Sequence, residues 1–221
     1  MTPADIIASA RVIIQDTLVP YRNSDADMLN YVNQTLKRMA VLRPDLFAEV
    51  GEVDTVAGSV IQSLPDGAIR LIDVFYVKDG EAVTEADRES LSRSYPGWVT
   101  ESAGTPVNFM RHIKNGEKYF LYPRPSEGVV LVAEYAMSPS AYSMDESISQ
   151  PPAAFLPVAV DGVVYLAESL DAEHVNSGRA KLFLDSFTQS LTVSLQARTV
   201  TDTKAAGLKP NRSVNTAGEV I

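Results

Sequence analysis

The stretch that decides the fold is PADIIASARVIIQDTL at residues 3–18, followed by SDADMLNYVNQTLKRMAVLR at residues 24–43. In the first segment apolar residues recur at intervals of three and four, which is typical of one face of an α-helix. Thr2 suits the N-cap and Pro3 the first helical position, so a helix is predicted over Pro3–Leu18. Its expected buried face consists of Ile6, Ala10, Ile13, Thr17 and Leu18, bordered by Ile7 and Ile14.

A second helix is predicted from the N-cap Ser24 to Arg43. Asp25 and Asp27 place negative charge in its first turn, where the helix dipole favours it. Pro44 disfavours the helical conformation at the residue before it and therefore ends the helix. The expected buried face consists of Met28, Val32, Leu36, Met39 and Ala40.

Helical spacing returns only after residue 155. The two helices at the start of the chain need helices from this later region as partners in order to bury their apolar faces. Pro157 suits the first turn of a helix whose apolar face would consist of Val160, Val163, Val164, Ala167 and Leu170. Gly162 costs this helix about 1 kcal/mol relative to Ala, so a close contact with another helix is predicted there. After a break or a capped restart at Asp171–Gly178, a long helix to about Thr199 would bury Ala180, Phe183, Leu184, Phe187, Leu191 and Leu195.

The middle of the chain has the alternation of short β-strands, separated by turn dipeptides such as Asp66-Gly67 and Asp79-Gly80. Asn115-Gly116 is the strongest hairpin signal, and a short helix capped by Thr84 is predicted to end at Ser94. About seven short strands in roughly a hundred residues suggest an antiparallel sandwich or small barrel. Six of these strands can be delimited: Glu52–Ala57, Ser59–Leu64, Ala68–Lys78, Val107–Lys114, Glu117–Tyr122 and Val129–Ala136.

These elements predict an α+β fold, in which an antiparallel β-sandwich or barrel is inserted into a four-helix bundle. Residues 1–49 and 151–199 would form the helical bundle domain, and residues 50–150 the inserted β domain. Val50 and Gln150 should then lie close together, with Ser138–Pro152 as a polar connector. Residues 200–221 are polar and poor in apolar side chains, and are expected to form an extended C-terminal tail.

Composition limits the classes of function. The net charge of −9 argues against a nucleic-acid surface built from Lys and Arg. The chain has no cysteine, which excludes thiol catalysis, disulfide bonds and Cys-ligated metals. The first residues lack the pattern of a signal peptide, and no apolar run reaches the length of a membrane span, so a soluble protein without membrane contact is expected.

Residues that carry chemistry are few and scattered, so no catalytic, metal-binding or cofactor-binding residues are predicted. His112 and His174 lie outside any nucleophile motif, and a surface, structural or capping role is preferred for both. Asp145-Glu146 is interpreted as a solvated linker rather than a Ca²⁺ site. The aromatic residues Tyr119, Phe120 and Tyr122 would stack on sugars or bases if exposed, but their alternation favours packing within a sheet. The residues alone therefore indicate a structural or interaction protein and not an enzyme.

Four stretches, in order along nearly the whole chain, add a family resemblance. They are residues 11–47 with Tyr21-Arg22-Asn23-Ser24-Asp25 and Arg43-Pro44-Asp45; residues 86–106 with Ala86-Asp87-Arg88, Tyr95-Pro96-Gly97-Trp98 and Gly104-Thr105-Pro106; Tyr119–Pro125; and Leu166–Glu173 with Arg179-Ala180 and Phe183–Phe187. This ordered set resembles the head-to-tail adaptor proteins of tailed bacteriophages, particularly the tail tubular protein A-like adaptors of short-tailed phages. Asn23 departs from the family pattern, which often has an aromatic residue after the Tyr-Arg pair.

The resemblance implies a structural virion protein that forms a ring, commonly dodecameric, between the portal protein and the tail nozzle or tail tube. Genome DNA would pass through the ring without sequence-specific binding, and an acidic lumen would repel its phosphates. Such a protein would be made in the host bacterial cytoplasm and reside at the head–tail interface of the virion. A carbohydrate-binding module and a tail-completion (terminator) protein of the virion are the alternatives.

The C-terminal tail is the expected contact with the portal or a neighbouring subunit, because a polar segment of this kind orders only on a partner. The residues assigned to this contact are Lys204, Lys209, Arg212, Val220 and Ile221.

Overall fold

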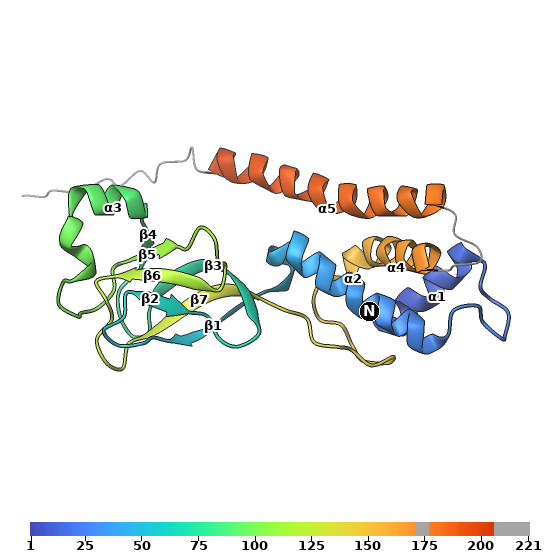
Figure 1. The fold of residues 1–221 in the computed structure, drawn as a ribbon, viewed down its shortest axis with the longest axis horizontal. Coiled ribbons are helices and arrows are strands. Elements are labelled where there is room, and N and C mark those ends of the chain that lie inside the picture. The colour runs from blue at the N-terminus through green and yellow to red at the C-terminus, as the bar shows by residue number, and fades with distance from the viewer. Residues whose placement is uncertain (171–176, 206–221) are drawn as a thin grey trace, which may run out of the picture.

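The computed structural model describes residues 1–170 and 177–205, and within them it has an α+β fold with five α-helices and two β-sheets (Figure 1). The helices are α1 (Pro3–Ile14), α2 (Asp25–Leu42), α3 (Arg88–Ser94), α4 (Leu156–Leu170) and α5 (Ser177–Ala205), with short 3₁₀ turns η1 (Pro44–Phe47), η2 (Pro96–Val99) and η3 (Ala153–Phe155). The strands are β1 (Ala48–Asp54), β2 (Ile61–Ser63), β3 (Ala68–Val77), β4 (Thr84–Glu85), β5 (Asn108–Arg111), β6 (Lys118–Tyr122) and β7 (Val130–Met137).

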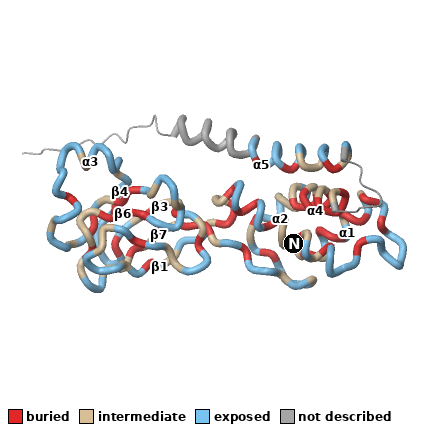
Figure 2. The backbone as a smooth tube through the Cα atoms, in the orientation of Figure 1, coloured by how far each residue is buried: buried red, intermediate tan, exposed pale blue. Residues whose placement is uncertain are grey.

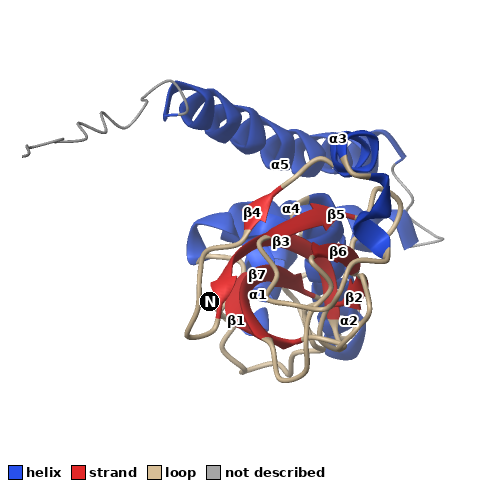
Figure 3. Ribbon diagram, turned by 90° about the vertical axis from the view of Figure 1, so that its left-hand side faces the viewer, coloured by secondary structure: helices blue, strands red, loops and turns tan. Residues whose placement is uncertain are grey.

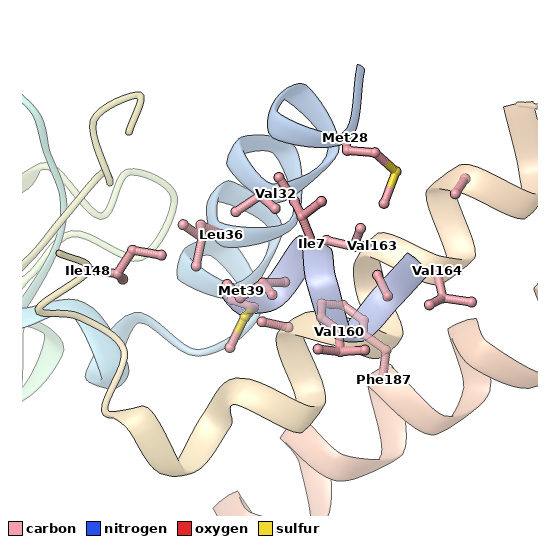
Figure 4. Close-up of a cluster of buried hydrophobic side chains, with 14 of the residues drawn as sticks. Ile7, Met28, Val32, Leu36, Met39, Ile148, Val160, Val163, Val164 and Phe187 are labelled. Carbon is pink, nitrogen blue, oxygen red and sulfur yellow. The ribbon is translucent and has the colours of Figure 1, made fainter. Parts of the chain in front are cut away.

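Helix α4 is the central helix of the helical part, because it packs against α1, α2 and α5 (Figure 1). Buried positions occur around most of its circumference, which is typical of a helix enclosed by other elements (Figure 2). One hydrophobic core therefore combines side chains from both ends of the described chain (Figure 4). Its members include Ile6 and Ile7 of α1, Met28, Val32, Leu36 and Met39 of α2, Val160, Val163 and Val164 of α4, and Phe187 and Leu191 of α5.

The close helix contact predicted at Gly162 is present. A Cβ atom at this position would lie 2.5 Å from Cγ2 of Thr35 and 3.1 Å from the ring of Phe187. Glycine thus allows α4 to approach α2 on one side and α5 on the other, where a larger residue would meet both. Dispersion contacts made by this approach offset the poor helix propensity of glycine.

The strands form a three-stranded sheet in the order β1-β7-β3 and a four-stranded sheet in the order β2-β6-β5-β4. In Figure 3 both sheets lie in front of α1, α2 and α4. Side chains from the two sheets share a second hydrophobic core that includes Val74, Phe109, Tyr119, Leu131 and Ala133. The expectation of a wholly antiparallel arrangement is wrong, since β4 pairs with β5 in parallel.

The predicted hairpin at Asn115-Gly116 joins β5 to β6, which pair antiparallel. Its loop is longer than a two-residue turn, because residues 112–117 separate the strands. Gly116 accepts a hydrogen bond from the backbone amide of Leu71 at 2.9 Å, and a Cβ there would lie 2.9 Å from the carbonyl oxygen of Ile69. Gly116 therefore allows the hairpin to dock closely on β3.

The connector at residues 138–152 is ordered against the helices, while Asp145 and Glu146 within it are exposed to solvent. Asn33 and Tyr142 exchange two hydrogen bonds, of 3.2 and 2.8 Å, and Ile148 is buried in the helical core. Gln150 donates from Nε2 to the carbonyl oxygen of Ala48 at 2.8 Å. The chain thus leaves the helical part and returns to it at neighbouring points.

Several element boundaries differ from the sequence prediction. Helix α1 ends at Ile14, because Gln15 adopts a left-handed conformation with φ of 57°, so Thr17 and Leu18 lie outside the helix. Asp87 caps α3, whereas Thr84, the predicted cap, belongs to β4. Helix α5 continues to Ala205 because no glycine or proline interrupts it before Gly207, so residues 200–205 are helical and do not form an extended tail.

Within the residues described, no helix combines the length and the hydropathy that a membrane crossing requires.

Replacing Gly162 by Ala tests the close packing of α4. We expect the free energy of unfolding to fall by about 1–2 kcal/mol in urea denaturation, because the added methyl group overpacks the contact while the helix propensity improves. The double variant Thr35→Ala/Gly162→Ala removes the nearest obstructing methyl group and should recover part of this loss. A Gly162→Ala variant more stable than the wild type would show that the contact is not close-packed.

Candidate functional site

The loop that joins α1 to α2, residues 15–24, projects from the end of the helical part that is farthest from the sheets (Figure 1). Leu18 is 82 % exposed and Val19 is 78 % exposed, and both are among the most exposed large apolar side chains described. The prediction that Leu18 contributes to a buried helix face is therefore wrong. We call residues 15–24 the α1–α2 loop.

A buried arginine holds this loop in place. Arg11 donates to Oδ2 of Asp16 at 2.8 Å, to the carbonyl oxygen of Asn23 at 2.9 Å and to Oδ1 of Asp25 at 2.7 Å. The side chains of Arg11 and Asp16 are 8 % and 5 % exposed. The guanidinium also lies 3.7 Å from the ring centroid of Tyr21, in a cation–π geometry. One side chain of α1 thus contacts the start, the middle and the end of the loop.

Asp16 completes the anchor by accepting hydrogen bonds from the backbone amides of Arg22 at 2.7 Å and Asn23 at 3.0 Å. Burial alone would raise the pKa of Asp16. The two amide hydrogen bonds and the charge of Arg11 outweigh burial, so the pKa of Asp16 lies below its ordinary value. The carboxylate is therefore ionised at neutral pH and fixes the backbone on both sides of the exposed apolar pair.

This arrangement suits binding better than catalysis. A loop with free backbone would lose conformational entropy on binding, whereas this one is already ordered by its charged hydrogen bonds. The exposed pair Leu18 and Val19 stabilises a complex only when a partner covers it. Sequence reasoning missed this site, although the apolar run Leu18-Val19-Pro20-Tyr21 between Asp16 and Arg22 was a usable signal.

A second buried arginine connects α2 to α5. Arg43 donates to both carboxylate oxygens of Asp45, at 2.8 and 2.7 Å, and to the carbonyl oxygen of Leu191 at 2.7 Å. Near the start of α5, Arg179 donates to the carbonyl oxygen of Ile13 at 2.5 Å and lies 3.7 Å from the buried carboxylate of Glu168. These contacts fix where α5 lies along the other helices.

Most of the residues predicted from the sequence to bind a partner lie outside the described part of the chain. Lys209, Arg212, Val220 and Ile221 follow residue 205, where the description ends. Lys204 lies in the last turn of α5 and not in an extended segment. The structure therefore neither brings these residues together nor separates them.

His112 has a structural role in the β5–β6 turn, as predicted. Its Nδ1 atom accepts from the backbone amides of Lys114 at 3.3 Å and Asn115 at 3.1 Å, and its ring stacks on Phe120 with centroids 5.6 Å apart. His174 lies outside the described residues. Glu146 accepts from the backbone amide of Ser143 at 3.0 Å, which places it in a local turn of the connector.

The aromatic residues of β6 pack within the protein, as predicted. Tyr119 is buried in the core between the sheets, and burial raises the pKa of its hydroxyl. Phe120 and Tyr122 make edge-on contacts with Trp98 of η2, with ring centroids 6.4 Å apart in both cases. Because these rings contact one another, the described structure gives no support to a row of exposed rings for sugar stacking.

Nowhere in residues 1–170 and 177–205 do three or more His, Asp or Glu side chains gather in a way that would hold a metal ion.

Comparison with known proteins identifies one family. The family model described as SU10 adaptor protein matches residues 1–212. The search of curated proteins finds no match. The family match covers the helical segments on both sides of the β region as well as the β region itself, and it agrees with the resemblance to phage adaptors carried by the motifs.

Replacing Asp16 by Asn tests the anchor of the α1–α2 loop. The free energy of unfolding should fall by about 3 kcal/mol at pH 7, because the buried Arg11 loses a charged partner. Asp25→Asn is the matched control: it removes a mostly exposed partner of the same arginine and should cost less than about 1 kcal/mol.

The pH dependence of the free energy of unfolding provides a second test of the same variant. Because the pKa of Asp16 is lowered by folding, its contribution is complete above the ordinary aspartate pKa of about 4 and is lost as the pH falls through the lower folded value. Stability of the wild type should therefore fall more steeply below pH 4 than that of Asp16→Asn. Identical slopes would exclude this carboxylate as an ionised anchor.

Proposed function

The chain belongs to the SU10 adaptor protein family, and from this membership we propose that it is a structural virion protein that joins the head of a tailed bacteriophage to its tail. The match over residues 1–212 is the observation that carries the proposal. We further propose that it acts as a ring, commonly dodecameric in adaptors of this kind, between the portal protein and the tail nozzle or tail tube. In this role the protein performs no catalysis and needs no cofactor.

The division into domains proposed from the sequence is supported by the two hydrophobic cores. One core joins side chains from residues 6–47 with side chains from residues 148–191, and the other lies within residues 53–135. We interpret the first as a four-helix bundle of residues 1–49 and 151–199, and the second as the interior of an inserted β-sandwich. A rigid helical body of this kind suits side-by-side packing around a ring axis.

The net charge of −9 supports a lumen through which DNA passes without sequence-specific binding. Carboxylates facing the channel would repel phosphates and prevent the genome from adhering to the wall. The mature protein would reside at the head–tail interface of the virion after synthesis in the host bacterial cytoplasm.

Two contacts with the neighbouring components are proposed. The α1–α2 loop would insert Leu18 and Val19 into an apolar site of the portal or of the tail protein. Lys204, Lys209, Arg212, Val220 and Ile221 would dock on an acidic portal surface, with the final apolar pair covered by the portal.

The double variant Leu18→Ser/Val19→Ser tests the loop contact. Because both side chains are exposed, stability should change by less than about 0.5 kcal/mol. Co-sedimentation with purified portal protein and, separately, with the tail protein should show at least about tenfold weaker binding to one of them, since apolar contact area is lost. Undiminished binding to both would exclude the loop as an interface.

Deleting residues 206–221 tests the tail while leaving α5 complete. Portal binding should be lost and the melting temperature should stay within about 2 °C of the wild type, because the deleted segment lies beyond the last described helix. Lys209→Glu/Arg212→Glu is the full-length charge-reversal counterpart and should weaken binding in a salt-dependent manner. Portal binding that survives both changes would contradict the assignment.

A further inference from the structure

The β region has a basic depression, which is unexpected in a chain with a net charge of −9. A cavity of about 540 Å³ lies between the start of β3 and the β5–β6 loop. Arg70, Arg111, Lys114 and Lys118 line it, no carboxylate is among its lining residues, and Glu117 of the same loop lines a different depression. We call this cavity the basic depression.

Of the four basic side chains that line the depression, only Arg111 forms an ion pair within the described part of the chain. Arg111 donates to both carboxylate oxygens of Glu85, at 2.6 and 3.3 Å, and to the carbonyl oxygens of Leu71 and Ile72, so it shapes the cavity. Arg70, Lys114 and Lys118 are exposed, and none of them forms an ion pair within the described part of the chain. Beside them Ile113 is 82 % exposed. The depression therefore offers free cations next to an aliphatic side chain.

Strand β1 carries the opposite pattern. Its sequence AEVGEVD contains the acids Glu49, Glu52 and Asp54 and no basic residue. Glu52 is paired with Lys78 at 2.7 Å, whereas Glu49 and Asp54 have no ion pair among the described residues. Val50 is 57 % exposed between them. We call β1 the acidic edge, because it is an outer strand of the sheet β1-β7-β3.

The register places the start of the acidic edge, at Glu49, level with the basic depression on the opposite side of one sheet, whereas Asp54 lies level with the far end of β3. Ala136 of β7 pairs with Ala48 of β1 on one side and with Arg70 of β3 on the other. The next position repeats this relation, since Tyr135 pairs with both Glu49 and Leu71. Rotation about an external axis that runs along the strands keeps this level, and would bring the start of one copy's acidic edge towards the basic depression of the next copy.

We propose that the acidic edge of one copy binds the basic depression of a second copy, in a contact that repeats head to tail. This inference rests on the proposed ring function and identifies the surface between neighbouring subunits. Unlike charges set the register, and Val50 and Ile113 supply the apolar contact. The contact joins two different patches, so it propagates around a ring and does not stop at a dimer. The exposed aliphatic residue in each patch favours a protein occupant over DNA phosphate.

Charge reversal provides the first test, with the full-length chain alone and mixed with portal protein. Lys114→Glu/Lys118→Glu and Glu49→Lys/Asp54→Lys should each weaken self-association by at least about tenfold in sedimentation velocity, because like charges then face each other. An equimolar mixture of the two variants should recover assembly, as should the single chain carrying all four substitutions. Lys37→Glu/Lys181→Glu makes the same charge change on exposed positions of α2 and α5 and should leave assembly intact.

Three outcomes of this test would overturn the proposal. They are a mixture that stays as dissociated as either variant, reversed variants that assemble like the wild type, and a wild type that is monomeric both alone and on the portal. Loss of binding to a DNA duplex in Lys114→Glu/Lys118→Glu, with self-association unchanged, would assign the depression to DNA. Circular dichroism and melting temperature establish that each variant is folded.

Cysteine cross-linking separates this inference from the adaptor role, because the chain has no native cysteine. Val50→Cys/Ile113→Cys should form a disulfide-linked ladder of multimers on oxidation, while each single variant should not. Val50→Cys/Leu182→Cys, with the second cysteine on an exposed position of α5, should form no ladder. Portal binding without a ladder would refute the subunit contact and leave the adaptor role standing. A ladder without portal binding would support the subunit contact and contradict the adaptor role.

Discussion

The structure depends on the close packing of α4 between α5 and the pair α1 and α2. At Gly162 no side chain separates α4 from Thr35 of α2 or from the ring of Phe187 of α5. Because α4 is buried around most of its surface, it supplies the apolar interior that the first hairpin lacks (Figure 4). The ends of the chain are thereby joined, and the hydrogen bond from Gln150 to Ala48 places the exit and the return of the β region at one point.

Three arginines then fix parts of the chain that apolar packing alone would leave adjustable; Arg11 and Arg43 are buried, and Arg179 is half-buried. Arg11, Arg43 and Arg179 each donate to a backbone carbonyl oxygen, of Asn23, Leu191 and Ile13 respectively. Desolvation offsets much of the Coulomb attraction in such sites, so their main effect is to specify one geometry. The proposed ring would need this precision, because an error in one subunit contact repeats at every other contact.

Features that depend on a few neighbouring residues could be predicted from the sequence: the caps Thr2 and Ser24 and the β5–β6 hairpin. The glycine in α4 also predicted a close helix contact, but the sequence did not identify Thr35 and Phe187 as its partners. Features that depend on distant partners could not. Helix α1 stops at Ile14, although apolar spacing continues to Leu18, because Asp16 turns inward to Arg11. The parallel pairing of β4 with β5 and the burial of Ile148 likewise need tertiary contacts. For the same reason periodicity assigned Leu18 to the core and missed the exposed site that it forms.

Family membership, one core built from both ends of the chain and an anchored apolar loop all agree with a rigid adaptor that acts through its surfaces. Electron cryomicroscopy of the full-length chain bound to its portal protein tests this account most directly. The account predicts a closed ring, with the helical parts of successive copies side by side and a continuous central channel. Copies attached to the portal separately, without contact between neighbours, would contradict it.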